Sequence, residues 1–237
     1  MDRSPGEQRQ RGEGEASGDL TDANRGRRER FQEPAAAGRH EEEHAPADWW
    51  EDKDMRQIYT KTGDDGSTSL LYGGRLSKGD ELVDAYGAID EAVATLGMAR
   101  AACTDRERAD LLLLLQRELF VAAADLAVNP RHRDRLTAGR SLVTPEMTAN
   151  LERLIDSLVH ERPLRPVFVV PGATPTGAAL DLARTVVRRA ERHAVRARAA
   201  GRTVSADVLG YLNRLSDLLF VLARHAADGV EEPASHD

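Results

Sequence analysis

Apolar residues recur at helical spacing in five segments of the chain, separated by short polar links. Residues three, four and seven positions apart share one side of an α-helix, so each segment has one apolar side. Thr144-Pro145 marks a helix start, since threonine suits the N-cap and proline the first turn, and Gly201 suits a helix end. We predict helices over about 79–100, 105–128, 144–161, 176–199 and 205–227.

The fifth helical segment is apolar nearly all round, which is typical of a helix buried on most sides. Asn213 and Asp217 lie one turn apart on it, and polar groups in such a setting need partners. A satisfied buried network and a functional pair both fit this pattern. Five helices with short links predict an all-α fold, a five-helix antiparallel bundle of the ferritin-like kind. The apolar fifth helix also favours a homo-oligomer.

The fourth helical segment carries charges along the edge of its apolar stripe. Arg184, Arg188 and Glu191 follow one line beside that stripe, whereas Arg189 and His193 point away from the core. A solvated helix face explains many such arginines. The other hypothesis is a polyphosphate site, because a guanidinium group stays charged and binds phosphate bidentately.

Two aspartates lie at the edges of apolar stripes, Asp90 in the first helical segment and Asp125 in the second. A half-buried aspartate needs a cation, and arginine is the expected partner of Asp90. A hydrogen bond inside the bundle fits Asp125 equally well.

A segment rich in Gly, Asp, Ser and Thr, residues 58–70, precedes the bundle. Gly63 and Gly66 allow close approach of the backbone to a ligand, and Lys61 with neighbouring hydroxyl and N–H groups suits phosphate oxygens. Ordinary turns have the same composition. The segment lacks the G-x-x-x-x-G-K-[ST] pattern, so it is no P-loop.

Composition separates residues 1–55 from the rest, since they hold 15 acidic and 9 basic residues, a net of −6 in a chain of net −7. So polar a segment cannot bury enough apolar surface to fold, and we predict a disordered acidic tail followed by one domain over 56–230. The nearly neutral domain gives no electrostatic argument for nucleic acid. No apolar run approaches the roughly 18 residues of a membrane span, and no secretory signal is recognisable. The expected location is the cytoplasm.

Four sequence blocks carry a recognisable pattern. They are Tyr59-Thr60-Lys61-Thr62-Gly63-Asp64-Asp65-Gly66, Ala85-Tyr86-Gly87-Ala88-Ile89-Asp90-Glu91, Phe168-Val169-Val170-Pro171-Gly172 with Ala183-Arg184 through Arg188-Arg189-Ala190-Glu191-Arg192, and Tyr211-Leu212-Asn213-Arg214-Leu215-Ser216-Asp217-Leu218-Leu219-Phe220. Together these blocks resemble the PduO-type ATP:cob(I)alamin adenosyltransferases, and the similarity covers residues 56 to about 227. One residue departs from the family pattern, because Ala173 stands where many members have a second glycine after Pro171-Gly172.

The resemblance implies a homotrimer with active sites between subunits, which transfers the 5′-deoxyadenosyl group of ATP to the cobalt of cob(I)alamin or a related corrinoid. Mg²⁺ would sit on the phosphates, without a protein metal site. Asp90 of one subunit would pair with Arg184 of the next, and Phe168 would bound the corrinoid pocket. The implied catalytic residues are Asp90, Arg184, Arg188 and Glu191. The implied ATP-binding residues are Thr60, Lys61, Thr62, Gly63, Ser67, Thr68, Lys78, Arg188, Glu191 and Asn213.

Two other functions fit the same helices. A non-catalytic bundle that binds nucleotide or corrinoid would keep the fold without turnover. A purely structural helical trimer would need no polar residues on the apolar fifth helix.

Overall fold

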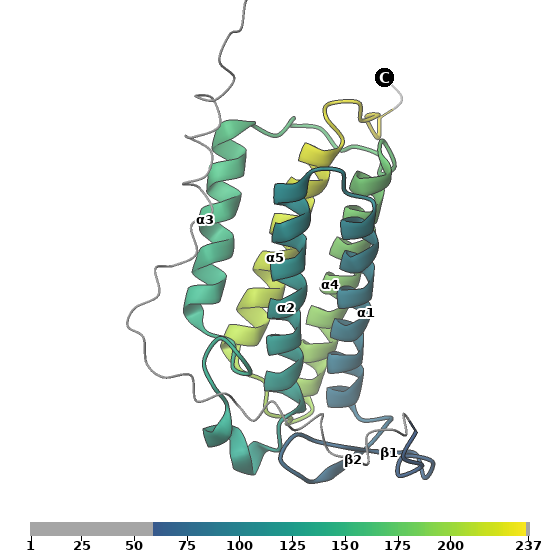
Figure 1. The fold of residues 1–237 in the computed structure, drawn as a ribbon, viewed down its shortest axis with the longest axis vertical. Coiled ribbons are helices and arrows are strands. Elements are labelled where there is room, and N and C mark those ends of the chain that lie inside the picture. The colour runs from purple at the N-terminus through teal and green to yellow at the C-terminus, as the bar shows by residue number, and fades with distance from the viewer. Residues whose placement is uncertain (1–58, 236–237) are drawn as a thin grey trace, which may run out of the picture. The chain divides into compact units, whose positions relative to one another are not determined.

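The computed structural model describes residues 59–235, so the predicted disordered tail lies outside the described residues. The described helices and strands begin with a short hairpin and end in the last bundle helix (Figure 1). In chain order they are β1 (Ser67–Ser69), β2 (Arg75–Ser77), α1 (Glu81–Ala101), α2 (Arg106–Ala127), the 3₁₀ helix η2 (Pro130–Arg135), α3 (Pro145–Glu161), α4 (Pro175–Ala199) and α5 (Ala206–Ala226).

The five predicted α-helices are present, and their ends agree with the prediction to within two residues. Side-chain caps explain most of the starts, because each cap oxygen accepts a backbone N–H group that has no partner within the helix. Asp80 accepts from the Leu82 N–H at 3.0 Å, and Asp105 accepts from the Arg108 N–H at 2.8 Å. Thr144 occupies the predicted N-cap of α3, but its side chain makes no capping bond.

The helices form an upright bundle in which α1 packs against α2 and α4, and α4 packs against α5 (Figure 1). These three pairs are antiparallel. The fifth-segment helix α5 also packs against α3, and that pair is parallel, so the prediction of an antiparallel bundle is wrong for it. The reason is the long link 162–174, which lets the chain cross the end of the bundle and start α4 away from α3.

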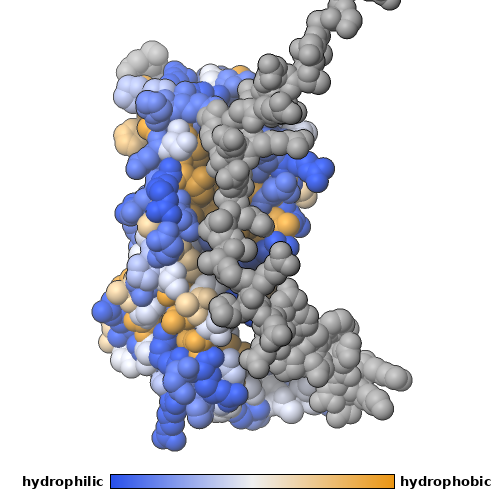
Figure 2. All heavy atoms as spheres, turned by 60° about the vertical axis from the view of Figure 1, so that its left-hand side comes forward, coloured by the Kyte–Doolittle hydropathy of each residue, from blue (hydrophilic) through white to orange (hydrophobic). Residues whose placement is uncertain are grey.

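A single apolar cluster fills the bundle between the helices, with leucine, valine and alanine from α1, α2, α4 and α5. Ten residues of α5 are buried, including Tyr211, but Phe220 remains 39% exposed. The fifth helix is therefore buried on most sides but not all. Figure 2 shows further hydrophobic patches among charged residues on the side of the molecule that carries α3.

Three structural features were missed from the sequence: the hairpin, η2 and the neighbours of α3. The hairpin strands are three residues long, with Thr68 opposite Leu76. So short an alternation carries no usable period. No helix in residues 59–235 is both long enough and apolar enough to cross a membrane.

The departure at Ala173 causes no backbone strain. Gly172 takes the positive φ of 126° that its turn requires, and Ala173 is not among the residues with positive φ. Glycine adopts that region without the steric penalty of a side chain.

Candidate functional site

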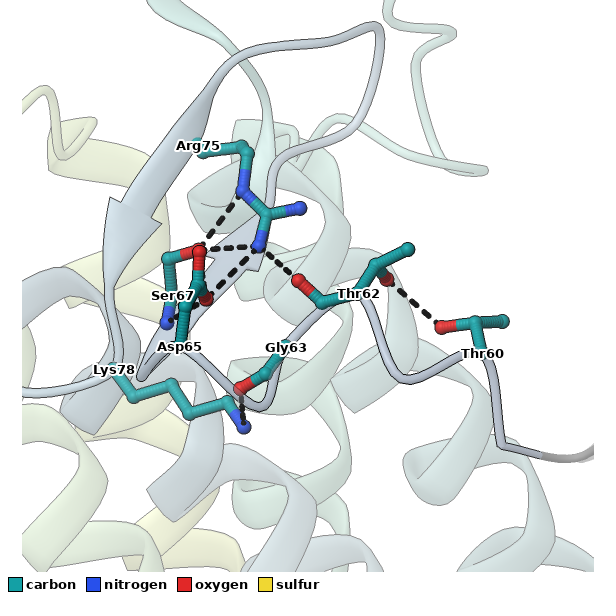
Figure 3. Close-up of polar contacts among 7 residues, drawn as sticks. All are labelled: Thr60, Thr62, Gly63, Asp65, Ser67, Arg75 and Lys78. Carbon is teal, nitrogen blue, oxygen red and sulfur yellow. Dashed lines mark hydrogen bonds and ion pairs between the residues drawn. The ribbon is translucent and has the colours of Figure 1, made fainter.

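The glycine-rich segment folds into a compact loop that closes on the hairpin (Figure 3). The Thr60 and Thr62 hydroxyls lie 2.8 Å apart, and the Lys78 ammonium donates to the Gly63 carbonyl at 2.8 Å. Lys61 is held at a φ of 57°, which is uncommon for a residue with a side chain. Gly66 also has a positive φ, of 81°. The backbone is thus shaped before any ligand arrives.

Arg75 of β2 joins the loop to the hairpin. Its guanidinium group binds the Ser67 hydroxyl and the Thr62 carbonyl, and lies 3.3 Å from the Asp65 carboxylate (Figure 3). Ser67 donates to Asp65 from its hydroxyl and its backbone N–H, and these bonds, helped by the Arg75 charge, hold the pKa of Asp65 below its usual value. Arg75 was not among the predicted site residues.

A second polar group lies where α4 meets α5. The Asn213 amide donates to the Glu191 carboxylate at 3.0 Å, and Glu191 is partly buried. Arg188 lies one turn before Glu191 and is exposed; within residues 59–235 its guanidinium group has no hydrogen bond or ion pair. Asp217, in contrast, pairs with Arg214 at 2.5 Å. The structure thus groups three predicted site residues, Arg188, Glu191 and Asn213.

A pocket of about 260 Å³ opens beside this group, between α3, α4 and α5. Arg184 and Arg188 enter it from α4, and Asp217 from α5, while its other walls are largely apolar. The remaining lining residues are Ile155, Val159, Leu164, Ser216, Phe220 and Val221. Two cationic side chains in a largely apolar lining suit a ligand that joins an anionic part to a hydrophobic part.

The predicted half-burial of Asp90 is wrong, because this aspartate is exposed on α1. In the described part of the chain it has no ion pair. Arg184 lies with its Nε atom 3.4 Å from Asp181 of its own helix. The neighbouring α1 residue Glu91 instead binds Arg189 of α4. A pairing of Asp90 with Arg184 of a second subunit is untested by a single chain and stays a prediction.

Asp125 differs from Asp90, since it is completely buried at the end of α2. Its carboxylate accepts from Arg133 at 2.6 Å and from the Val143 N–H at 3.0 Å. It therefore holds η2 and the start of the α3 segment against the bundle, which agrees with the structural alternative.

Phe168 lies in the link 162–174, with 90% of its surface exposed. The segment is extended around Val169, as predicted, and pairs there with Pro233 near the chain end. Val167 and Val170 are also exposed, at 45% and 51%, so this end of the bundle presents a small apolar surface.

The glycine-rich loop and Phe168 lie at opposite ends of the bundle. The loop precedes the start of α1, and the Phe168 link joins the end of α3 to the start of α4 (Figure 1). The 25 residues of α4 between these ends span about 37 Å at 1.5 Å per residue. One subunit therefore cannot bring its own loop and its own Phe168 to one small ligand.

The described residues contain no group of three or more His, Cys, Asp or Glu side chains placed to hold a metal ion. Carboxylates near the loop, such as Asp64 and Asp65, do not form such a group. The expectation that Mg²⁺ arrives on the phosphates of a nucleotide stays a prediction.

Comparison with known proteins bears on the whole bundle. The family model for cobalamin adenosyltransferase matches residues 58–226. A corrinoid adenosyltransferase of Citrobacter freundii is 40% identical over 173 residues, which cover 72% of this chain and 94% of the relative. The corrinoid adenosyltransferase of Mycobacterium tuberculosis (strain H37Rv) is 43% identical over 180 residues, 73% of this chain and 89% of that protein.

Solved structures that are similar to this chain belong to the same family. A variant of the PduO-type ATP:corrinoid adenosyltransferase from Lactobacillus reuteri, complexed with cobalamin and ATP, superimposes with a TM-score of 0.68 at 32% identity. The match covers 76% of this chain and 97% of that one. A second variant, complexed with ATP, gives a TM-score of 0.66 at 32% identity, over 76% of this chain and 100% of the other.

The fold is thus that of a helical-bundle transferase with polar groups on α4 and α5 and a glycine-rich loop at one end. The chain belongs to the cobalamin adenosyltransferase family.

Proposed function

We propose that this protein transfers the 5′-deoxyadenosyl group of ATP to the cobalt of a reduced corrinoid, with release of tripolyphosphate. The observation that carries the proposal is the group of Arg188, Glu191 and Asn213, three polar side chains that lie beside one another where α4 meets α5, next to an apolar-walled pocket. The family and the ligands of the similar solved structures support the same reaction.

The glycine-rich loop is the proposed triphosphate site. Lys61 and Gly66 shape its backbone through their positive φ angles. Arg75 stabilises the loop by donating to the Ser67 hydroxyl. Thr60, Thr62, Gly63, Ser67, Thr68, Lys61 and Lys78 offer hydroxyl, N–H and ammonium donors there. Phosphate oxygens would replace contacts such as that of Lys78 with the Gly63 carbonyl, since an ammonium group binds an anion more strongly than a neutral carbonyl.

The α4–α5 group is the proposed site of the nucleoside and the adjoining phosphates. The Asn213 amide fixes the Glu191 carboxylate, which leaves that carboxylate free to accept a further hydrogen bond at its other positions. Arg188 provides an unpaired cation for the leaving tripolyphosphate. Mg²⁺ bound to ATP would neutralise part of the same charge.

The chemistry needs no protein base, because cob(I)alamin is itself a strong nucleophile. The cobalt–carbon bond forms as the bond between C5′ and the triphosphate oxygen breaks, and its electron pair leaves with tripolyphosphate. The protein's contribution is to align C5′ with cobalt and to stabilise the growing negative charge. Phe168 is proposed to cover the lower side of the corrinoid and exclude the lower axial ligand, which makes reduction of Co(II) easier.

We propose a homotrimer with sites between subunits, as the family resemblance implies. The distance between the loop and Phe168, which one subunit cannot close, supports sites that two subunits share. Asp90 and Arg184 are the proposed contact across that interface. Asp90 supports this by being exposed and unpaired within residues 59–235. A cytoplasmic location stays a proposal from composition.

The decisive experiment mixes the purified protein with ATP, Mg²⁺ and cob(I)alamin under reducing, anaerobic conditions. Adenosylcobalamin should appear, identified by its absorbance and its light sensitivity, together with tripolyphosphate in equal amount. ATP binding without product, under conditions where the C. freundii relative turns over, would reject the enzyme in favour of a binding protein.

A further inference from the structure

The exposed side chain of Phe168 depends on its backbone for position, because only 10% of its surface is covered by the described protein. Its carbonyl accepts from the Ala234 N–H at 2.8 Å. Two residues on, the Val170 N–H donates to the Glu232 carbonyl at 2.8 Å. The segment 228–235, the C-terminal arm, is therefore the strand partner of the Phe168 segment.

The C-terminal arm is itself fixed by one buried side chain, that of Glu231. Its Oε1 atom lies 2.6 Å from Nε of Arg224, although the two are not aligned for a hydrogen bond, so the attraction is mainly electrostatic. Both side chains are at most 11% exposed. Arg165, from the Phe168 link, also donates to the Glu231 carbonyl at 3.3 Å.

The series of ion pairs extends from Arg224 to helix α4. The second donor group of Arg224 binds Asp181, which is 3% exposed, and Asp181 also contacts Arg184. The four side chains alternate in charge as Glu231, Arg224, Asp181 and Arg184, so their charges cancel. Buried charges persist only when they are paired in this way, and removing one leaves its neighbour uncompensated. This series of four charged side chains therefore fixes the C-terminal arm to α4, the helix that carries Arg184 and Arg188.

We infer that Glu231 and Arg224 are positioning residues that hold the C-terminal arm as a strand partner for the Phe168 segment, and thereby set the place of Phe168 at the corrinoid. The inference rests on the proposed role of Phe168. Neither residue touches a substrate in this account. Their effect is confined to the corrinoid side of the reaction for two reasons. The glycine-rich loop lies at the other end of the bundle, and in residues 59–235 no hydrogen bond or ion pair joins these side chains to the bonded pair Glu191 and Asn213.

Glu231→Gln tests the inference, because it keeps the size of the side chain and removes its charge. The KM for the corrinoid should rise about tenfold, below the 100-fold that a 1 Å misplacement can cost. The KM for ATP should stay unchanged. With ATP present, the absorbance of bound cob(II)alamin should shift back toward that of the form that keeps its lower ligand.

The matched control is Asp228→Asn in the same arm. Asp228 forms an exposed ion pair with Arg162, with 86% of the Asp228 side chain accessible, and asparagine tolerates its positive φ. This variant should behave as wild type. Deletion of residues 230–237 is a second variant, which should reproduce the Glu231→Gln spectrum while circular dichroism and the oligomer size stay unchanged.

Phe168→Ala separates this inference from the proposed function. If Phe168→Ala alters the cob(II)alamin spectrum and neither Glu231→Gln nor the deletion does, the positioning role is wrong and the proposed function stands. If Phe168→Ala leaves the spectrum unchanged, the proposed role of Phe168 is wrong. Equal rises in the KM for ATP and for the corrinoid would also contradict a role confined to the Phe168 segment.

Discussion

Two aspartates that look alike in the sequence lie in opposite surroundings. Asp125 at the end of α2 is completely buried and accepts from Arg133 and the Val143 N–H. Asp90 in the middle of α1 is exposed and, within residues 59–235, unpaired. A buried carboxylate whose hydrogen-bond partners all belong to the same chain stabilises the folded structure. A charge left without a partner at the surface is available to a second subunit or a ligand, and the exposed Arg188 belongs to the same class.

The largest expected effect is the loss of folding stability when the buried aspartate, Asp125, is replaced. Asp125→Ala leaves Arg133 without its carboxylate and the Val143 N–H without an acceptor. It should lower the free energy of unfolding by about 3–5 kcal/mol, measured by urea denaturation. Asp110→Ala on the same helix, where the pair with Arg106 is almost fully exposed, should change it little. Equal losses of unfolding free energy in Asp125→Ala and Asp110→Ala would show that burial of Asp125 adds nothing to stability.

The next effect should appear in catalysis alone. Arg188→Ala should lower kcat by about 100- to 1000-fold, as expected for a lost group that stabilises developing charge. Its midpoint of thermal unfolding and its oligomer size should match wild type, since Arg188 has no partner in the described chain. Arg198→Ala, on the exposed end of the same helix, is the control. Near-normal turnover of Arg188→Ala would refute its assignment.

Assembly should show a smaller effect. Asp90→Asn and Arg184→Gln should each weaken the trimer in sedimentation experiments, and the double variant should cost less than the sum of the two. We expect a coupling of at least about 1.5 kcal/mol for a close charge pair at an interface. Additive effects would show that the two residues do not meet. A matched pair at the surface of one subunit, Glu146 with Arg153, should leave assembly unchanged when its charges are removed.

The smallest effect concerns Glu118 of α2, which accepts from the buried Tyr211 hydroxyl at 2.8 Å. Burial raises the pKa of Glu118 above its ordinary 4.5, and the bond from Tyr211 opposes part of that rise. The folded protein thus holds this proton more tightly than the unfolded chain, and stability falls as pH rises from 4.5 through the raised pKa.

Glu118→Gln keeps an acceptor for Tyr211 and removes the charge. The variant should match wild type at low pH and exceed it at pH 7 in its urea midpoint. Glu146→Gln, on an exposed side chain, is the control. A wild-type advantage that grows with pH would give the opposite sign and contradict the raised pKa of Glu118.

The sequence predicted the five helices well because their signals are local. The apolar period and Thr144-Pro145 act within one or two turns. The caps that the structure shows at Asp80 and Asp105 are equally local. The parallel packing of α3 on α5 could not be predicted, because the apolar period of a helix does not indicate which other helix packs against it. Helical spacing singled out Arg184, Arg188, Glu191 and Asn213 in the candidate site. Their roles came from the family resemblance and remain proposals.

Contacts between distant positions could not be predicted from patterns. Arg224 and Asp181 are 43 residues apart, and Arg75 reaches back 13 residues to the Thr62 carbonyl. Many charged residues compete for such pairings along an arginine-rich chain. Only the folded backbone decides which of them meet. The same limit explains why the pattern alone could not distinguish the surroundings of Asp90 from those of Asp125.

The placement of α3 has a consequence for motion. This helix packs chiefly on α5 and buries only Met147 and Leu151, far fewer residues than any other bundle helix. Its amides should therefore exchange with deuterium through local opening, well before those of α4 and α5. Ile155 and Val159 of α3 form one wall of the pocket beside Arg184 and Arg188. Breathing of this outer helix would widen that pocket while the rest of the bundle stays closed.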